Sequence, residues 1–129
     1  MASFTLDAGA LIAADRGDRR FWKFQEEIDD EVDVFRVPAV VLTQVWRGPR
    51  NANLMRALRG CELETLDLEL ALAAGVLCGR AGTNDAVDAI VVASAARTGD
   101  HIVTTDPDDL RVLAAVATGV GRILDLNDL

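Results

Sequence analysis

The residues of this chain with the clearest chemical potential are aspartates. Asp7 and Asp106 each follow a short stretch that favours a strand, while Asp85 and Asp88 lie three residues apart, on one face of an expected helix. Carboxylates that converge in a fold repel one another unless a cation neutralises them. Oxygen ligands without His or Cys favour Mg²⁺ or Mn²⁺. Such an ion in an acidic cup suits phosphodiester hydrolysis, since it generates hydroxide and neutralises the leaving oxygen.

Each of these acids also has a purely structural interpretation. Asp7 could cap the turn that follows it, and Asp106, followed by Pro107 and two further acids, has the pattern of a helix start. Asp88, in contrast, opens the stretch 89–93, which is apolar on every side of a helix and therefore indicates burial. Capping does not explain the three placements together. We therefore predict a metal site at Asp7, Asp88 and Asp106, with Asp85 as a further ligand.

The pattern around these acids predicts an α/β fold. Strands are expected at 3–6, 32–37, 63–66, 101–104 and 122–126, and helices at 8–14, 18–28, 38–46, 51–58, 68–78, 84–97 and 107–116. We expect Gly79 to end the helix 68–78, and Thr83 or Asn84 to cap the next one. Strands that alternate with helices indicate a mostly parallel sheet covered on both faces, in one domain spanning 1–129. Ligands of such sheets bind at the carboxyl ends of the strands.

Composition excludes several classes of function. There are 21 acidic and 13 basic residues, a net charge of −8, which excludes a general phosphate-binding surface but not a nuclease that meets phosphates through metal ions. The sequence contains no glycine-rich phosphate-binding loop with a lysine, which excludes a P-loop nucleotide hydrolase. Cys61 and Cys78 lack metal-ligand spacing, so we expect free thiols and a cytoplasmic protein. The longest apolar run, 70–78, is too short for a membrane helix.

Three stretches resemble the signature blocks of PIN-domain ribonucleases: 5–12 (TLDAGALI), 88–93 (DAIVVA) and 103–110 (VTTDPDDL). Within that family the chain is most similar to the VapC-type toxins of bacterial type II toxin–antitoxin pairs. The resemblance implies a three-layer α/β/α fold with strand order 3-2-1-4-5 and a Mg²⁺-dependent endoribonuclease. It assigns metal roles to Asp7, Asp88 and Asp106, an additional acid to Asp85 and a neighbouring hydroxyl to Thr105. It also implies an RNA substrate, a cognate antitoxin and a homodimer.

One position departs from the family pattern. Where the family usually has a glutamate after the second strand, the stretch 38–47 has Gln44. A glutamine keeps an oxygen ligand but loses one negative charge. We expect Asp85 to supply the missing acid, because it lies one turn from Asp88. The alternative is a catalytically weak PIN-like domain that serves as a protein- or RNA-binding module.

The acidic cup also indicates what the partner should look like. A basic inhibitor segment is its natural complement, because an arginine could pair with Asp7, Asp88 or Asp106 and compete with the metal. The resemblance implies an antitoxin of this kind, with an apolar helix that docks near the helices of Trp22 and Trp46.

Overall fold

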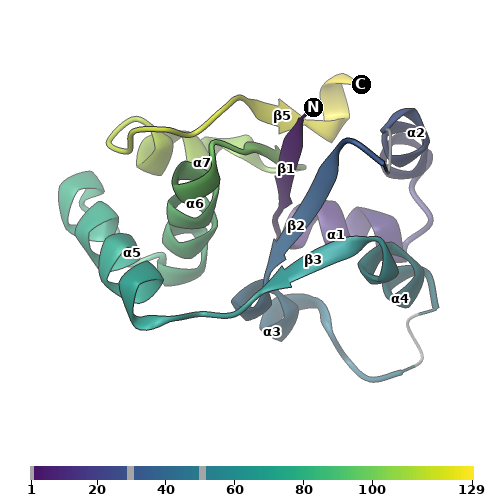
Figure 1. Ribbon diagram of the computed structural model, residues 1–129, viewed down its shortest axis with the longest axis horizontal. Helices are drawn as coiled ribbons and strands as arrows, with labels where there is room; N and C mark the ends of the chain where they lie inside the picture. Colours follow the sequence, from purple (N-terminus) through teal and green to yellow (C-terminus); the bar gives the residue numbers. More distant parts are fainter. Residues whose placement is uncertain (1, 29–30, 50–51) are drawn as a thin grey trace.

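The computed structural model describes residues 2–28, 31–49 and 52–129 (Figure 1). Five strands form one parallel sheet in the order β3-β2-β1-β4-β5, which confirms the predicted order. The strands are β1 (Ser3–Leu6), β2 (Val34–Pro38), β3 (Cys61–Glu64), β4 (His101–Thr104) and β5 (Ile123–Asp125). All of their carboxyl ends therefore meet at one edge of the sheet, which we call the carboxyl edge.

Helices cover both faces of this sheet. Figure 1 shows α5, α6 and α7 on one side of the strands and α1, α2 and α4 on the other. The α-helices are α1 (Ala8–Asp15), α2 (Arg19–Glu27), α3 (Leu42–Val45), α4 (Ala52–Arg59), α5 (Leu68–Ala81), α6 (Ala86–Thr98) and α7 (Pro107–Ala114). The described residues also form two short 3-10 helices, η1 (Ala39–Val41) and η2 (Leu126–Asp128). No described helix has both the length and the apolar composition that crossing a membrane requires.

Helix α6 is the central helix of the fold. Its residues 89–95 are all buried, and Val91 and Val92 are fully inaccessible to solvent. The strands beneath it are equally apolar, with Leu6, Ile102 and Val103 fully buried. A helix that is apolar on all sides has to be covered on all sides, as the sequence predicted for 89–93. Because the first turn of α6 carries Asp88, this packing fixes one candidate acid rigidly at the carboxyl edge.

Several predicted boundaries were wrong. Strand β3 begins two residues earlier than expected, because Cys61–Glu64 pairs in register with Phe35–Pro38 of β2. Pro38 therefore ends β2 instead of starting a helix, and the expected helix 38–46 is divided into η1 and α3. An edge strand buries little of its own surface, so its apolar pattern carries little information about register. The predicted helix start at Asn51 lies outside the described residues.

Helix α5 also differs from the prediction. It continues through Gly79 to Ala81 and ends at Gly82, which adopts φ 71° in the left-handed region. That conformation favours glycine and is a common helix end. The next helix is capped by Asp85 and not by Thr83 or Asn84, because the Asp85 carboxylate accepts a hydrogen bond from the Asp88 backbone N–H at 3.4 Å. The Thr83 hydroxyl instead accepts one from the Asp85 N–H at 3.2 Å.

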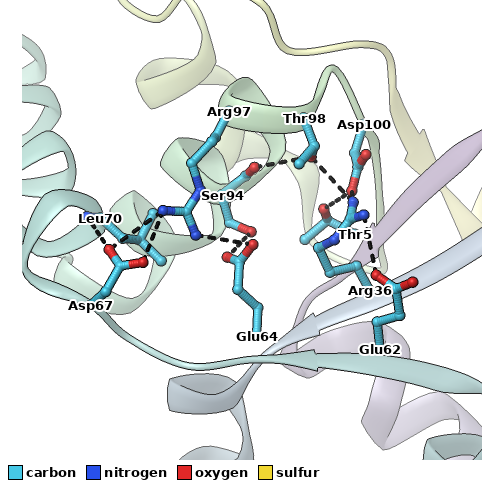
Figure 2. Close-up of polar contacts among 10 residues, drawn as sticks. All are labelled: Thr5, Arg36, Glu62, Glu64, Asp67, Leu70, Ser94, Arg97, Thr98 and Asp100. Carbon is cyan, nitrogen blue, oxygen red and sulfur yellow. Dashed lines mark hydrogen bonds and ion pairs between the residues drawn. The ribbon is translucent and has the colours of Figure 1, made fainter.

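A buried ion pair joins the strands to the end of α6 (Figure 2). Asp100, fully buried just before β4, accepts hydrogen bonds on Oδ2 from the Thr5 hydroxyl at 2.8 Å and from the Arg36 guanidinium. Arg36 also donates to the Thr98 hydroxyl at 3.2 Å. Buried charges need such partners, because leaving one uncompensated costs several kcal/mol. The pair therefore ties β1, β2 and the end of α6 together.

Candidate active site

Asp7 lies between β1 and α1 and is only 7% exposed. Its Oδ1 accepts a hydrogen bond from the Ala10 N–H at 3.0 Å, and its Oδ2 accepts one from the Thr104 hydroxyl at 2.7 Å. Burial raises the pKa of this carboxyl, while the hydrogen bonds from Thr104, Ala10 and Gly9 act in the opposite direction. Asp7 therefore caps α1, as the structural interpretation allowed. The same contacts hold its carboxylate in a fixed orientation.

Asp106 follows β4, next to Asp7. It occupies the N-cap position of α7, but its side chain makes no capping hydrogen bond. The carboxylate is exposed, and its negative charge contributes to the raised pKa of Asp7. The Asp106 side chain therefore does not cap α7, and its oxygens are available to a ligand.

Thr104 is a member of the site that the sequence analysis missed. In addition to donating to Asp7, its hydroxyl accepts the Asp106 backbone N–H at 3.0 Å. One buried hydroxyl therefore positions both acids. The sequence analysis favoured the neighbouring Thr105, and the alternation of side chains along a strand decides between the two: Thr104 is fully buried at the end of β4 and points toward Asp7.

Thr105 lies against the first turn of α1 instead. A Cβ atom at Gly9 would come within 2.5 Å of the Thr105 hydroxyl oxygen and 3.4 Å of Asp7 Oδ1. Glycine is therefore required at position 9 for the loop after β4 to approach α1 this closely. This contact brings the chain segments of Asp7 and Asp106 together.

Three further acids form a compact group at the start of α6 and α7. Asp85, Asp88 and Asp109 each place one carboxylate oxygen within 4.8 Å of the others. Asp109 lies three residues after Asp106, so the Asp-Pro-Asp-Asp pattern contained a signal for it. The sequence analysis assigned that acid only to the helix start. Within the described residues, neither Asp7 nor Asp106 belongs to this compact group.

Electrostatics connects the two sets of acids. The pKa of Asp88 is raised to about 7, first by burial, then by its hydrogen bond with Asp85, and then by the negative charges of Asp85, Asp7 and Asp109. The negative charge of Asp106 in turn helps to raise the pKa of Asp7. Asp7 and Asp88 therefore each lie close enough to neighbouring acids at the carboxyl edge for those charges to act on their pKa values.

Gln44 lies on α3, which contacts α1 and follows the carboxyl end of β2. Its side chain is exposed. A role for its amide oxygen in binding the metal stays a prediction.

The donor set of this edge suits a hard divalent cation. Every candidate ligand is a carboxylate, hydroxyl or amide oxygen, and Mg²⁺ and Mn²⁺ prefer such oxygens. Burial and then repulsion from the neighbouring acids raise the pKa of Asp88, and a bound cation would offset that repulsion. The acids present thus fit a Mg²⁺ or Mn²⁺ ion that binds between them.

The raised pKa of Asp88 makes a stability prediction for the metal-free protein. A carboxyl whose pKa is higher in the folded than in the unfolded state makes the folded protein less stable as the pH rises from about 4 to about 7. Asp88→Asn should therefore raise the free energy of unfolding at pH 8 by about 1–2 kcal/mol, discounted because the group is half exposed. At pH 4 the substitution should have little effect. Urea unfolding in EDTA at both pH values measures the difference.

Asp128→Asn is the matched control, because Asp128 is exposed in η2 and lies outside the acidic group. It should change stability little at either pH. A lower stability of Asp88→Asn at pH 8 would contradict the electrostatic account of the site.

Comparison with known proteins places this arrangement in a family. The family model described as PIN domain matches residues 4–116, whereas a search of curated proteins finds no match. Among solved structures, the fold is similar to FitAcB from Neisseria gonorrhoeae, with 12% identity over 98% of this chain and 99% of that chain and a TM-score of 0.67. It is also similar to DNA-bound VapBC from Salmonella typhimurium, with 16% identity, the same coverages and a TM-score of 0.67.

A third similar structure is VapBC-5 from Mycobacterium tuberculosis, described as a member of the VapBC family of toxin–antitoxin systems. It shares 18% identity over 96% of this chain and 99% of that chain, with a TM-score of 0.60. At these identities the structures support the fold, while the family model covers most of the chain. Together with the five-stranded parallel sheet and its acidic carboxyl edge, they lead to one conclusion: this chain belongs to the PIN domain family.

Proposed function

We propose that this protein is a Mg²⁺- or Mn²⁺-dependent endoribonuclease that acts as the toxin of a toxin–antitoxin pair. The observation that carries the proposal is the placement of Asp7, Asp88 and Asp106 at the carboxyl edge of a PIN domain, where the charge of Asp106 acts on Asp7 and the charge of Asp7 acts on Asp88. The similarity to VapBC structures supports the toxin role.

In this proposal the acids have distinct tasks. Asp7, Asp88 and Asp106 hold the metal, and Asp85 and Asp109 add negative charge beside it. When bound, the ion supplies an activated water and neutralises charge on the phosphate. Thr104 keeps Asp7 and the Asp106 backbone in register, so that the carboxylates need little rearrangement when the metal binds. Gln44 can contribute an uncharged oxygen from α3.

Asp7→Asn tests the enzymatic proposal. The amide preserves the shape of the side chain and can still accept the Ala10 N–H, but it removes the charge that binds the cation. We expect Mn²⁺ binding in calorimetry to disappear and metal-dependent RNA cleavage to fall by about 100-fold or more. Expression of the wild-type chain alone should arrest bacterial growth, and expression of Asp7→Asn should not.

Asp108→Asn is the matched control, because Asp108 is an exposed acid that pairs with Arg111. It should retain both cleavage and growth arrest. Growth arrest by Asp7→Asn equal to that of the wild type would contradict the nuclease proposal. A wild-type chain that binds RNA or a partner but cleaves no RNA with either metal would favour the binding-module alternative.

The antitoxin is proposed to dock beside α3. An apolar groove of about 450 Å³ is lined by Leu42, Thr43, Trp46 and Leu58, and Trp46 is 39% exposed. Trp22 is less available, because the Arg56 guanidinium lies 3.7 Å from the centre of its ring. Since α3 follows β2 at the carboxyl edge, an apolar helix in this groove could extend a basic segment toward the acids. Charge complementarity therefore favours an apolar helix followed by arginine or lysine.

Leu58→Glu should weaken antitoxin binding by about tenfold or more, because it puts a charge into the apolar groove. Val112→Glu adds the same charge at an exposed apolar residue of α7 and should leave binding unchanged. Isothermal titration with the product of the neighbouring gene measures both. Equal affinities of the two variants would place the antitoxin elsewhere.

A second copy of the chain is proposed to cover α5. Leu68, Leu72 and Val76 form a stripe along this helix and are 74%, 63% and 51% exposed. Glu69 and Arg80, eleven residues apart, lie on one flank of the stripe because eleven residues make about three turns. In a two-fold pair of antiparallel helices the same flank meets itself, so each Glu69 would face the Arg80 of the other copy.

Charge reversal tests this pairing. Glu69→Arg and Arg80→Glu should each weaken the dimer, because each places like charges opposite one another twice. The double variant should restore the dimer, since it exchanges the two charges. Light scattering after size-exclusion chromatography gives the mass of each species. Monomers in all three variants, or dimers in all three, would contradict the antiparallel arrangement.

A further inference from the structure

After its N-cap Asp18, whose carboxylate accepts the Arg20 N–H, helix α2 carries its charges in an order that does not suit a helix. It begins with Arg19 and Arg20 and ends with Glu26 and Glu27. The N-terminus of a helix has a partial positive charge, so stability favours acidic residues there and basic residues at the other end. The observed order disfavours the isolated helix. An anionic ligand at the start of α2 would explain it.

The basic residues at this end are available to a ligand. Arg16, Arg19 and Lys23 are exposed, and none of them forms an ion pair within the described part of the chain. Segment 16–23 has four basic residues and one acid, whereas the whole chain has a net charge of −8. This segment is therefore a local concentration of positive charge on an otherwise acidic protein.

A groove accompanies these cations. It has a volume of about 490 Å³ and lies between α2 and β5, with Arg19, Arg20 and Lys23 on the α2 side and Leu124 on the β5 side. Phe24 contributes an apolar wall, and Glu27 lies at the far end of the groove. Cations beside apolar side chains suit a chain that alternates phosphates with sugars and bases.

Arg20 connects this groove to the active site. Its guanidinium is held by Asp18 at 2.6 Å and donates to the Asn127 side-chain oxygen at 2.6 Å. Asn127 in turn donates to the Thr105 carbonyl at 2.9 Å. Thr105 directly precedes Asp106, so two hydrogen bonds join the start of α2 to the carboxyl edge. The start of α2, which lines the groove, is therefore linked by hydrogen bonds to the segment that carries Asp106.

We propose that the groove between α2 and β5 binds the sugar–phosphate backbone of single-stranded RNA, with Arg19 and Lys23 contacting phosphates on one side of the scissile bond. The inference rests on the proposed ribonuclease function. It explains how an acidic site attracts a polyanion. The metal neutralises charge at the reacting phosphate, while the α2 cations provide the attraction that the carboxyl edge lacks.

The test separates RNA binding from cleavage. All variants carry Asp7→Asn, and the probe is a fluorescein-labelled single-stranded RNA of mixed sequence, measured by anisotropy without metal. Arg19→Glu with Lys23→Glu should raise the dissociation constant by about tenfold or more. Loss of two phosphate contacts should also reduce the slope of log affinity against log salt by about 1.4.

Arg59→Glu with Arg122→Glu is the matched control. Both residues are exposed. Arg59 lies two residues before β3 and Arg122 directly before β5, at the amino ends of the strands, opposite the acids. This pair of substitutions changes the net charge by the same amount as the pair on α2. Its affinity for RNA should stay within about twofold of the parent protein. In a separate measurement on the protein with its native Asp7, Arg19→Glu with Lys23→Glu should retain Mn²⁺ binding, because neither residue belongs to the acidic group.

Equal losses of RNA affinity in the two pairs would show an effect of net charge alone and overturn the proposal. The proposal would also be overturned if Arg19→Glu with Lys23→Glu left RNA affinity unchanged but abolished antitoxin binding. That result would assign the groove to the protein partner. Failure of the ribonuclease proposal is a different result, namely no metal-dependent cleavage by the wild-type chain.

Discussion

The repulsion among carboxylates at one edge of the sheet is the constraint on which the rest of this structure depends. Parallel strands place all of their carboxyl ends together, and here two of those ends and two helix starts carry aspartates. A flexible chain would separate them. This one holds Asp7 with two hydrogen bonds, and it carries Asp88 on a helix whose residues 89–95 are buried. The repulsion can then be relieved by protonation, since burial and then the neighbouring charges raise the pKa of Asp88, or by a cation.

Contacts at both ends of the strands maintain this edge. Gly9 permits the loop after β4 to approach α1, and Thr104 joins Asp7 to the backbone of Asp106. At the other end of the strands, Asp100 pairs with Arg36 and Thr5 and fixes β1 and β2 against the end of α6. Burying that pair adds little stability compared with apolar residues. It does fix the register between the strands and the helix that carries Asp88, and a metal site requires that register.

The sequence predicted the features that depend on local pattern. The buried helix after Asp88 and the positions of Asp7 and Asp106 at strand ends follow from alternation and apolar runs. The strand order was implied only by the resemblance of three ordered blocks to PIN-domain ribonucleases. Features that depend on side-chain direction were missed. Thr104 and Thr105 are neighbours of the same type, and only the pleat of β4 determines which hydroxyl reaches Asp7. Asp109 looked like part of a helix start until α7 was placed beside α6. The ion pair of Arg36 with Asp100 spans 64 residues, a separation at which no spacing rule applies.

The distribution of charge along the chain separates two tasks. Residues 61–129 contain twelve acids and four basic residues, whereas residues 1–60 contain nine of each. The acidic part supplies three of the strand and helix ends that surround the candidate metal, and the balanced part supplies α2, α3 and α4. In the proposed function, a cation therefore binds where negative charge is concentrated, while longer ligands meet surfaces on which positive charge is not cancelled. In the same proposal, RNA and a basic inhibitor make opposite demands on the carboxyl edge, since RNA cleavage needs the metal and the inhibitor would replace it. Such a division of charge would allow the protein to be active when the metal is bound and restrained when a basic segment occupies the acids.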